Sequence, residues 1–449
     1  MPTARRRAPS SPIPTTRATR RAARAALLAL LLALAACFAG ADRAHTPASM
    51  ATEPSGAVAP DTAAAARAPT VVVLSLDGVR FDMLERSDLP AFARLRREGA
   101  RAARLLPPFP SLTFPSHVTV ATGAPADVHG IVANRFRDRA RGEEFDYGAD
   151  ASWIDAEPLW VAAERQGVRA AVFFWVGSET DWRGAGATYR MRPFDSKVPE
   201  SAKVDRILAW LDLPPGERPQ LVMAWWHGAD HAGHEHGPAS PEVAAALRAQ
   251  DAQLGRLLAG LDAREAWAAT TLVVVSDHGM IDAGSPIDVG AALRAAGVRA
   301  RVVHAGAVAH VHLDSPGSEE AARAVAALAG IDGVAAYARD DLPPRLRYAH
   351  PSRVGDVVVV AGPTRVLTSA RGGLARVLGG AGGPRGMHGY DVASVPEMAG
   401  VFLALGRGTG RGAALGDVRS IDVAPTVAAL LGIAPPAASE GRAIALDPR

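Results

Sequence analysis

Short apolar runs alternate with amphipathic helical segments along the chain from residue 68 onward. The run TVVVLSLD at 70–77 is continuously apolar and rich in β-branched residues, which is typical of a strand buried on both faces. The segment 88–99 has apolar residues at helical spacing and ends in glycine. The same strand and helix signals recur in the segments 156–175, 204–226, 241–279 and 421–432. The alternation predicts an α/β protein with a mainly parallel sheet that helices cover on both faces.

Two regions depart from this alternation. Residues 300–385 contain strand-like runs followed by a glycine-rich stretch, and they predict a small irregular lobe or a lid. Residues 38–67 are rich in alanine, proline, threonine and serine without apolar periodicity, and they predict a flexible linker. The expected folded domain therefore spans residues 68–449, which is long enough to bury a large core.

Charge is distributed unevenly along the chain. The formal net charge is +3, yet residues 1–37 contain seven arginines and no acidic residue. Subtracting these seven charges from +3 leaves −4 for the rest of the chain. The body of the protein therefore lacks the basic excess of nucleic-acid-binding proteins, and we expect no nucleic-acid partner.

The N-terminal segment has the features of an export signal. Its arginines lead into AALLALLLALAAC at 25–37, an apolar stretch too short to cross a bilayer as a stable helix. It ends in Cys37, the only cysteine of the chain, and resembles the lipobox of bacterial lipoproteins, in which the cysteine is lipidated after cleavage. An ordinary secretory signal is the alternative. Both predict an exported protein of the bacterial envelope, in the periplasm or at the cell surface, and the lipobox adds a lipid anchor as the only membrane contact.

Acidic residues end three of the predicted strands. Asp77 ends the run at 70–77, Asp277 ends TLVVVSD with His278 beside it, and Asp230 follows QLVMAWW by a few residues. Because ligands collect at the carboxyl ends of parallel strands, we expect these side chains to share one edge of the sheet. An aspartate after a strand is also a common helix N-cap. The prediction of a site therefore depends on all of them meeting at that edge.

The segment WWHGADHAGHEHGP at 225–238 contains four histidines. Asp230 and His234 are four residues apart and can meet on one side of a helical turn or a compact loop. Another histidine, His388, lies between residues of a glycine-containing stretch, PRGMHGYD, in which the backbone can approach closely. Carboxylates and imidazoles without thiolates indicate zinc, or less specifically manganese or iron. Three histidines of the segment have no ligand assignment: His227, His231 and His236.

The stretch FPSLTFPSHVTVATG at 109–123 places Thr113 just before a predicted helix that begins near Pro115. The ordinary role of a threonine in this position is to cap the helix. The functional alternative is a nucleophile at the amino end of the helix, where the helix dipole and a metal ion stabilise the alkoxide. The residues alone leave both roles open.

In order and spacing, these segments resemble the nucleotide pyrophosphatase/phosphodiesterase family of the alkaline phosphatase superfamily. The resemblance covers roughly residues 70–435 and depends on LSLDGVRFDML, FPSLTFPSHVTVATGAPADVHGIVANRF, AEPLWVAAERQG, GADHAGHEHGP, VVVSDHGM and MHGYD. It implies an alkaline-phosphatase-like α/β/α sandwich that holds two zinc ions at one edge.

The resemblance also implies a role for individual residues. One zinc ion is expected to bind Asp77, Asp277, His278 and the oxygen of Thr113, and the other Asp230, His234 and His388. Asn134, in GIVANRF, matches an asparagine that hydrogen-bonds a phosphoryl oxygen. Phe114 and Trp225 match two positions that hold a nucleobase between them.

The implied function is an exported two-zinc phosphodiesterase that hydrolyses a small phosphodiester or nucleotide through a phospho-threonine intermediate at Thr113. Members that cleave nucleotides commonly have a tyrosine and an acidic-Pro-Asp step where Trp225 and GAD stand here, and an asparagine in place of Ser116. None of these departures is a metal ligand, so hydrolysis is better supported than nucleotide preference. The alternatives are a phosphomonoesterase, a phospholipid or phosphonate hydrolase, and a non-catalytic zinc-binding lipoprotein.

Overall fold

The computed structural model describes residues 68–368 and 385–448. The predicted signal segment with Cys37, the predicted linker at 38–67 and part of the glycine-rich stretch lie outside these residues. Within the part of the chain that is described, no helix is both long and apolar enough to cross a membrane.

An eight-stranded sheet forms the centre of the fold, in the order β19-β2-β18-β9-β1-β8-β6-β7. Seven of its strands run in the same direction, and β18 runs antiparallel to both of its neighbours, β9 and β2. In chain order the strands are β1 (Thr70–Leu76), β2 (Ala100–Ala102), β6 (Ala170–Phe173), β7 (Tyr189–Met191), β8 (Leu221–Trp226), β9 (Thr270–Val275), β18 (Phe402–Gly406) and β19 (Ala413–Leu415).

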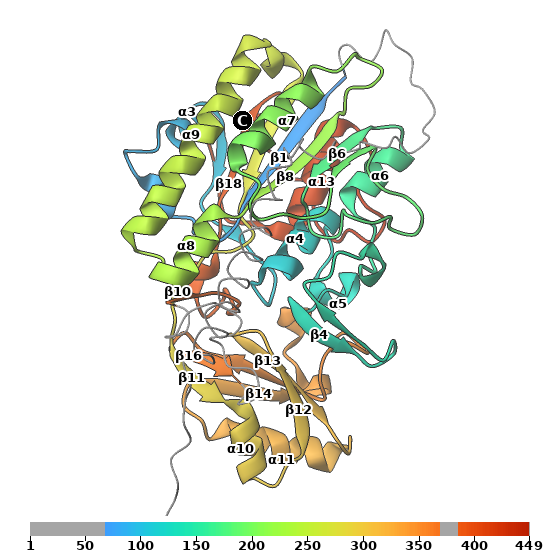
Figure 1. The fold of residues 1–449 in the computed structure, drawn as a ribbon, viewed down its shortest axis with the longest axis vertical. Helices are drawn as coiled ribbons and strands as arrows, with labels where there is room; N and C mark the ends of the chain where they lie inside the picture. The colour runs from blue at the N-terminus through green and yellow to red at the C-terminus, as the bar shows by residue number, and fades with distance from the viewer. Residues whose placement is uncertain (1–67, 369–384, 449) are drawn as a thin grey trace, which may run out of the picture. The chain divides into compact units, whose positions relative to one another are not determined.

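Helices cover both faces of this sheet (Figure 1). One face packs against α3 (Pro90–Glu98), α7 (Glu200–Leu211) and α9 (Pro241–Ala263). The other packs against α4 (Thr113–Thr122), α6 (Leu159–Arg165) and α13 (Val423–Leu431). Two short helices, α5 (Ala126–His129) and α8 (Gly228–His236), lie close to the ends of these layers.

Strand β1 is continuously apolar because both of its faces pack into the core. Successive side chains of a strand point to opposite faces, so Val72 and Leu74 enter the core beneath α7 and α9, whereas Val71 and Val73 enter the core beneath α4 and α13. All seven residues of β1 are buried. The predicted α/β fold with a mainly parallel, doubly covered sheet is confirmed.

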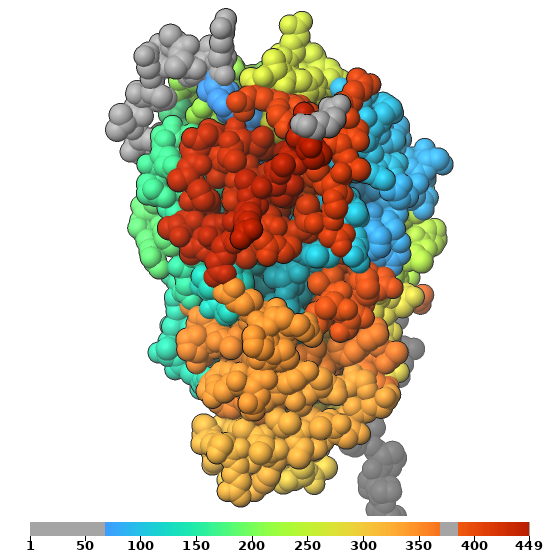
Figure 2. All heavy atoms as spheres, turned by 180° about the vertical axis from the view of Figure 1, so that it is seen from behind, coloured from blue at the N-terminus to red at the C-terminus, as the bar shows by residue number. Residues whose placement is uncertain are grey.

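A second, four-stranded antiparallel sheet lies within the region that lacks the regular alternation. It has the order β12-β13-β15-β14 and lies within the orange part of Figure 2. Its strands are β12 (Ala300–His304), β13 (Val308–Leu313), β14 (Val334–Ala338) and β15 (Val357–Ala361), and α10 (Val289–Ala295) and α11 (Ser318–Ala329) cover one face.

Four further pairs of short strands, each pairing over two to four residues, lie outside these two sheets in the described part of the chain. Strands β4 (Arg135–Asp138) and β5 (Glu143–Asp146) form a hairpin that packs against the lobe sheet through a shared apolar cluster. The remaining short strands are β3 (Leu105–Leu106), β10 (Ile281–Asp282), β11 (Ser285–Asp288), β16 (Arg365–Thr368), β17 (Gly386–Met387) and β20 (Val418–Arg419).

Candidate active site

The three central strands bring the predicted acidic residues to one edge of the sheet. Ser75 of β1 lies opposite Trp225 of β8 and Val275 of β9, so the residues that follow each strand leave the sheet side by side. Asp77 and Asp277 are buried there, and Asp230 lies on the first turn of α8. The expectation that these acids share one edge is met by the strand register.

Asp230, His234 and His388 form one group of side chains whose oxygen and nitrogen atoms lie within 4.8 Å of one another. Asp230 and His234 are one turn apart on α8, and His388 directly follows β17. The Nε2 atoms of His234 and His388 are 3.1 Å apart. The segment that could have been a compact loop is thus a helix, which places the carboxylate and the imidazole on one side.

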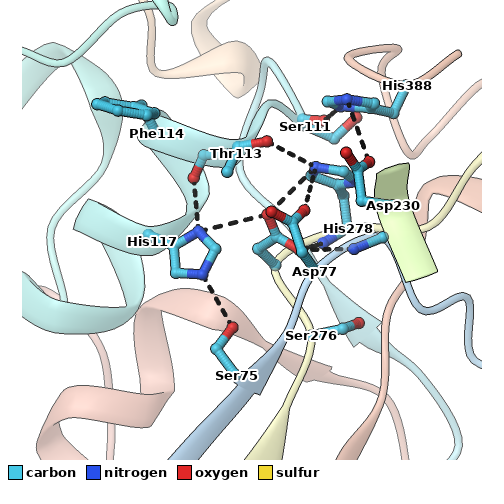
Figure 3. A network of polar contacts seen from close by, with 12 residues as sticks. Ser75, Asp77, Ser111, Thr113, Phe114, His117, Asp230, Ser276, His278 and His388 are labelled. Atoms are coloured by element: carbon cyan, nitrogen blue, oxygen red, sulfur yellow. Dashed lines mark hydrogen bonds and ion pairs between the residues drawn. The ribbon is translucent and has the colours of Figure 1, made fainter. Parts of the chain in front are cut away.

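A second group surrounds the imidazole of His278 (Figure 3). Its Nε2 atom lies 3.5 Å from Asp77 Oδ1, 3.2 Å from Asp277 Oδ2 and 3.3 Å from the hydroxyl oxygen of Thr113. The rings of His278 and His388 stack at 3.7 Å between centroids, which joins the two groups. All seven predicted ligands therefore converge on one small volume.

The three imidazoles share one hydrogen-bonding pattern. In each, Nδ1 donates to a backbone carbonyl, at 2.9 Å for His234 to Gly386, 2.9 Å for His278 to Gly279 and 3.0 Å for His388 to Ser111. A neutral imidazole that donates from Nδ1 has a free lone pair on Nε2. This backbone bond from the other nitrogen is the arrangement that orients histidines as metal ligands.

The electrostatics of the cluster also fit a bound cation. Burial raises the pKa of Asp77 and of Asp277, and the nearby Asp230 carboxylate raises both further. Burial lowers the pKa of His278, and it lowers that of His388 to about 4, so the imidazoles do not supply compensating charge. Three buried carboxylate oxygens have no hydrogen-bond partner: Asp77 Oδ1, Asp230 Oδ1 and Asp277 Oδ2. Carboxylates and neutral imidazoles with free lone pairs are the donor set of zinc sites.

Thr113 is the first residue of α4 and not its cap. The N-cap position is taken by Leu112, and the Thr113 hydroxyl faces His278. The adjacent amide of Phe114 donates to Oδ1 of Asn134 at 2.9 Å, which fixes the orientation of the asparagine amide beside Thr113. The amino end of a ten-residue helix thus faces the cluster, where its dipole favours negative charge.

Two supporting contacts were not predicted. The indole Nε1 of Trp225 donates to Asp77 Oδ2 at 3.1 Å, so this tryptophan holds a predicted ligand. His117 lies behind the cluster, where its ring contacts Ser75 Oγ at 3.0 Å and the Thr113 carbonyl at 2.8 Å, with Asp277 Oδ2 3.3 Å away (Figure 3). The sequence assigned His117 no specific partner, because these contacts join residues distant in the chain.

A cavity of about 540 Å³ opens beside the cluster. Phe114 and Trp225, the two residues predicted to hold a nucleobase, both line it, but Trp225 is only 8% exposed and Phe194 stacks on it at 5.1 Å. Phe194 is 39% exposed and Tyr147 is 47% exposed. These two are the exposed large hydrophobic side chains of the described residues, and both line this cavity. Their exposure is the signal of a binding surface, and it has no counterpart in the sequence pattern.

The other histidines of the 225–238 segment differ in position. His227 and His231 line the cavity, and the His231 side chain is highly exposed. His236 lies near the end of α8, between Glu235 and Glu242. None of the three belongs to either group of candidate ligands among the described residues.

Comparison with known proteins places this site in a family. The sequence profile of the type I phosphodiesterase / nucleotide pyrophosphatase family matches residues 71–391. The chain belongs to this family. An uncharacterized pyrophosphatase/phosphodiesterase of Schizosaccharomyces pombe is 35% identical over 350 residues, which cover 75% of this chain and 71% of the relative.

Two further relatives show how much of the chain is shared. Human ectonucleotide pyrophosphatase/phosphodiesterase family member 1 is 32% identical over 228 residues, but the match covers only 24% of the human protein. The structure of murine ectonucleotide pyrophosphatase/phosphodiesterase 5 matches with a TM-score of 0.74 and 26% identity, covering 82% of this chain and 96% of the murine one. An inactive variant of that murine protein, in complex with AMP, matches equally well.

Gly78 offers a test of how tightly the cluster is packed. Its backbone has a φ of +70°, and a Cβ atom there would lie 2.9 Å from both the Cα and Cβ of Asp230. Gly78→Ala should therefore displace Asp230 and lower kcat/KM for a diester substrate by at least about tenfold.

The matched control is Gly142→Ala. Gly142 has nearly the same φ, +71°, but a Cβ atom there would meet nothing within 4 Å. It should cost about 1 kcal/mol of unfolding free energy through backbone strain and leave turnover unchanged. Steady-state kinetics and thermal unfolding of both variants make the comparison, and equal activity of the two would contradict the packing argument.

Proposed function

We propose that this family member is an exported two-zinc phosphodiesterase/nucleotide pyrophosphatase that works through a phospho-threonine intermediate. The observation that carries the proposal is the convergence of Thr113, at the amino end of α4, with three histidines that donate from Nδ1 to backbone carbonyls and three carboxylates with unpartnered oxygens. The catalytic domain is proposed to begin near residue 68.

Thr113 is the proposed nucleophile. Its oxygen attacks phosphorus, the bond to the leaving oxygen breaks, and water then cleaves the phospho-threonine. Asn134, with Oδ1 occupied by the Phe114 amide, presents Nδ2 to a phosphoryl oxygen that gains charge. The first zinc ion would be held by Asp77, Asp277, His278 and Thr113, and the second by Asp230, His234 and His388. Bound zinc would supply positive charge and Lewis acidity at the attacking and leaving oxygens.

The lining of the cavity supports a diester over a monoester. Of the described residues that line it, none is a lysine or an arginine, and Glu179 and Glu235 add negative charge. A monoester dianion has one more charge than a diester and would need an additional cation. A diester instead has a second organic group, which the aromatic wall can cover.

We propose that a nucleobase lies against Phe114 and Phe194. Phe114 and Phe194 both line the cavity, and Phe194 stands between Trp225 and the solvent. The AMP complex of the murine relative supports a nucleotide ligand. In this proposal Trp225, which the sequence assigned to the base, instead holds Phe194 on one side and Asp77 on the other.

Export and the lipid anchor are proposed from the sequence. The arginine-rich start, the apolar stretch at 25–37 and the single cysteine support a lipoprotein of the bacterial envelope. Small phosphodiesters in the periplasm or at the cell surface would then be the substrates within reach, and the lipid on Cys37 would be the only membrane contact.

Thr113→Ala should lower turnover of an aryl nucleotide diester by at least about a thousandfold, because the nucleophile is deleted while the other donors remain. Bound zinc, measured by elemental analysis, should stay at about two ions per chain. A variant that keeps more than a tenth of wild-type turnover is incompatible with Thr113 as nucleophile.

The wild-type enzyme provides the metal control for this prediction. Chelation should abolish turnover, and zinc should restore it better than magnesium, because three imidazoles suit zinc and magnesium prefers oxygen ligands. A monoester assayed beside the diester separates the two reactions, and faster hydrolysis of the monoester would favour the phosphomonoesterase alternative.

Phe194→Ala should lower kcat/KM for thymidine 5′-(p-nitrophenyl) phosphate by about tenfold, since loss of base stacking removes roughly 1–3 kcal/mol. Hydrolysis of methyl p-nitrophenyl phosphate, which has no base, should change little. Trp225→Phe is the comparison, because it keeps an aromatic ring but removes the donor to Asp77, and it should slow both substrates. Equal losses on both substrates for Phe194→Ala would argue against a base slot.

Cys37→Ser should move the protein out of the membrane fraction and abolish labelling by fatty acid, because the lipid is the proposed anchor. Ala44→Ser, seven positions further along, is the matched control and should behave like the wild type. Fractionation and immunoblotting measure both. A Cys37→Ser protein that is cleaved normally and still sediments with membranes would show that another feature anchors it.

A further inference from the structure

Tyr147 lies where the two cavities around the candidate active site meet. A second, smaller cavity of about 60 Å³ adjoins the cavity that Phe114 and Phe194 line. The two share four lining residues among those described: Asn134, Tyr147, His234 and His388. Two of these are candidate metal ligands and one is the candidate phosphoryl-binding asparagine. The fourth, Tyr147, has no role in the function proposed above.

The hydrogen bonds around Asn134 orient the Tyr147 hydroxyl. The Phe114 amide occupies Asn134 Oδ1, which turns Nδ2 toward the Tyr147 oxygen at 3.4 Å. Because the tyrosine oxygen accepts this bond, its own hydrogen is free to donate. The amide Nδ2 has a second hydrogen that is also free. Two donors, one from each residue, are thus adjacent in the cavity that Thr113 also lines.

The backbone holds Tyr147 in this position. Its φ is +47°, in the left-handed region that disfavours a side chain of this size. The Tyr147 amide donates to the Asn134 carbonyl at 3.0 Å, and the ring packs edge-on against Phe114 at 5.3 Å. Strained residues of this kind persist where surrounding contacts fix them, and they cluster at functional sites.

The charge around the ring favours donation. The Arg135 guanidinium lies over the Tyr147 ring, 5.4 Å from its centroid, while it pairs with Asp146 at 2.6 Å. A cation over the face of a phenol stabilises electron density in the ring and makes the hydroxyl a stronger donor. The hydroxyl remains neutral, which suits the single negative charge of a phosphodiester.

From this geometry we propose that Tyr147 is a catalytic residue that, with Asn134, donates a hydrogen bond to a non-bridging phosphoryl oxygen of the substrate. The inference rests on the phosphodiesterase function proposed above. Charge on that oxygen increases as the nucleophile approaches, so the bond strengthens in the transition state. Tyr147 would then act mainly on kcat, whereas a residue that only lines the cavity would act mainly on KM.

The first experiment compares Tyr147→Phe with the wild type on thymidine 5′-(p-nitrophenyl) phosphate. We expect kcat to fall by at least about tenfold while KM changes by less than about twofold. Tyr189→Phe is the matched control, since it removes a hydroxyl that bonds the Glu217 carbonyl and does not line either cavity. An unchanged kcat in a Tyr147→Phe protein that melts like the wild type would overturn the proposal.

The second experiment compares kcat for the two diastereomers of the corresponding phosphorothioate ester. The ratio of the two kcat values does not depend on the fraction of folded protein. Sulfur accepts hydrogen bonds weakly, so wild-type enzyme should be slowed more by sulfur at the position that faces Tyr147. In Tyr147→Phe this difference between diastereomers should shrink by at least about threefold. A ratio that is the same in both proteins would assign Tyr147 a structural role only.

A binding measurement separates this inference from the proposed function. AMP affinity is measured by calorimetry for Thr113→Ala and for Thr113→Ala combined with Tyr147→Phe, so no turnover is required. The second protein should bind AMP at least about threefold more weakly, because the dianionic phosphate of AMP already carries the extra charge that the diester oxygen gains only in the transition state. Equal affinities would refute the contact even if the enzyme hydrolyses diesters. Weaker binding without diester hydrolysis by the wild type would retain the contact and refute the proposed reaction.

Discussion

The repulsion among three converging carboxylates, two of them buried and one half-buried, is the constraint on which the rest of the site depends. Asp77, Asp230 and Asp277 converge at the edge of the sheet, and burial raises the pKa of the first and the last. Their hydrogen-bond donors among the described residues are backbone amides and an indole, and no lysine or arginine pairs with them. Such a cluster is unfavourable without compensating charge, so the fold must hold these side chains in place, and the cation proposed for this site would supply that charge.

The central sheet supplies the rigidity. Strands β1, β8 and β9 are buried on both faces, and each ends at the same level of the sheet. The carboxylates therefore cannot separate without breaking strand pairing or opening a close-packed core. Helices add the orientation: α8 places Asp230 and His234 one turn apart, and α4 aims its amino end at the cluster from the other side.

The same contacts connect the cluster to the aromatic cavity. Trp225 donates to Asp77 and stacks against Phe194, while the Phe114 amide orients Asn134 next to Thr113. Trp225 and Phe114 therefore connect the aromatic wall to a candidate ligand and to the candidate phosphoryl-binding residue.

The sequence by itself determined the fold class, the family and the order of the catalytic motifs. Continuous β-branched runs predicted the buried strands, and the helical part of the segment predicted at 241–279 is α9, Pro241–Ala263. The helical part of the segment predicted at 204–226 begins earlier, at Glu200, because its first turn is polar and lacks the apolar spacing used to recognise it. The seven candidate ligands were found because each follows a strand or lies at helical or motif spacing, which are local signals.

Only the tertiary structure decided which side chains support and surround these residues. The Trp225–Asp77 bond joins residues 148 positions apart, and the stacking of Phe194 on Trp225 joins a loop to a strand. Packing between distant segments likewise decides the exposure of Phe194 and Tyr147. It also decides the hydrogen bonds from the three imidazoles to backbone carbonyls. The periodicity of apolar residues predicts the face of a helix or strand on which a residue lies. A contact between distant segments depends on how the whole chain packs, which periodicity in a single sequence does not predict.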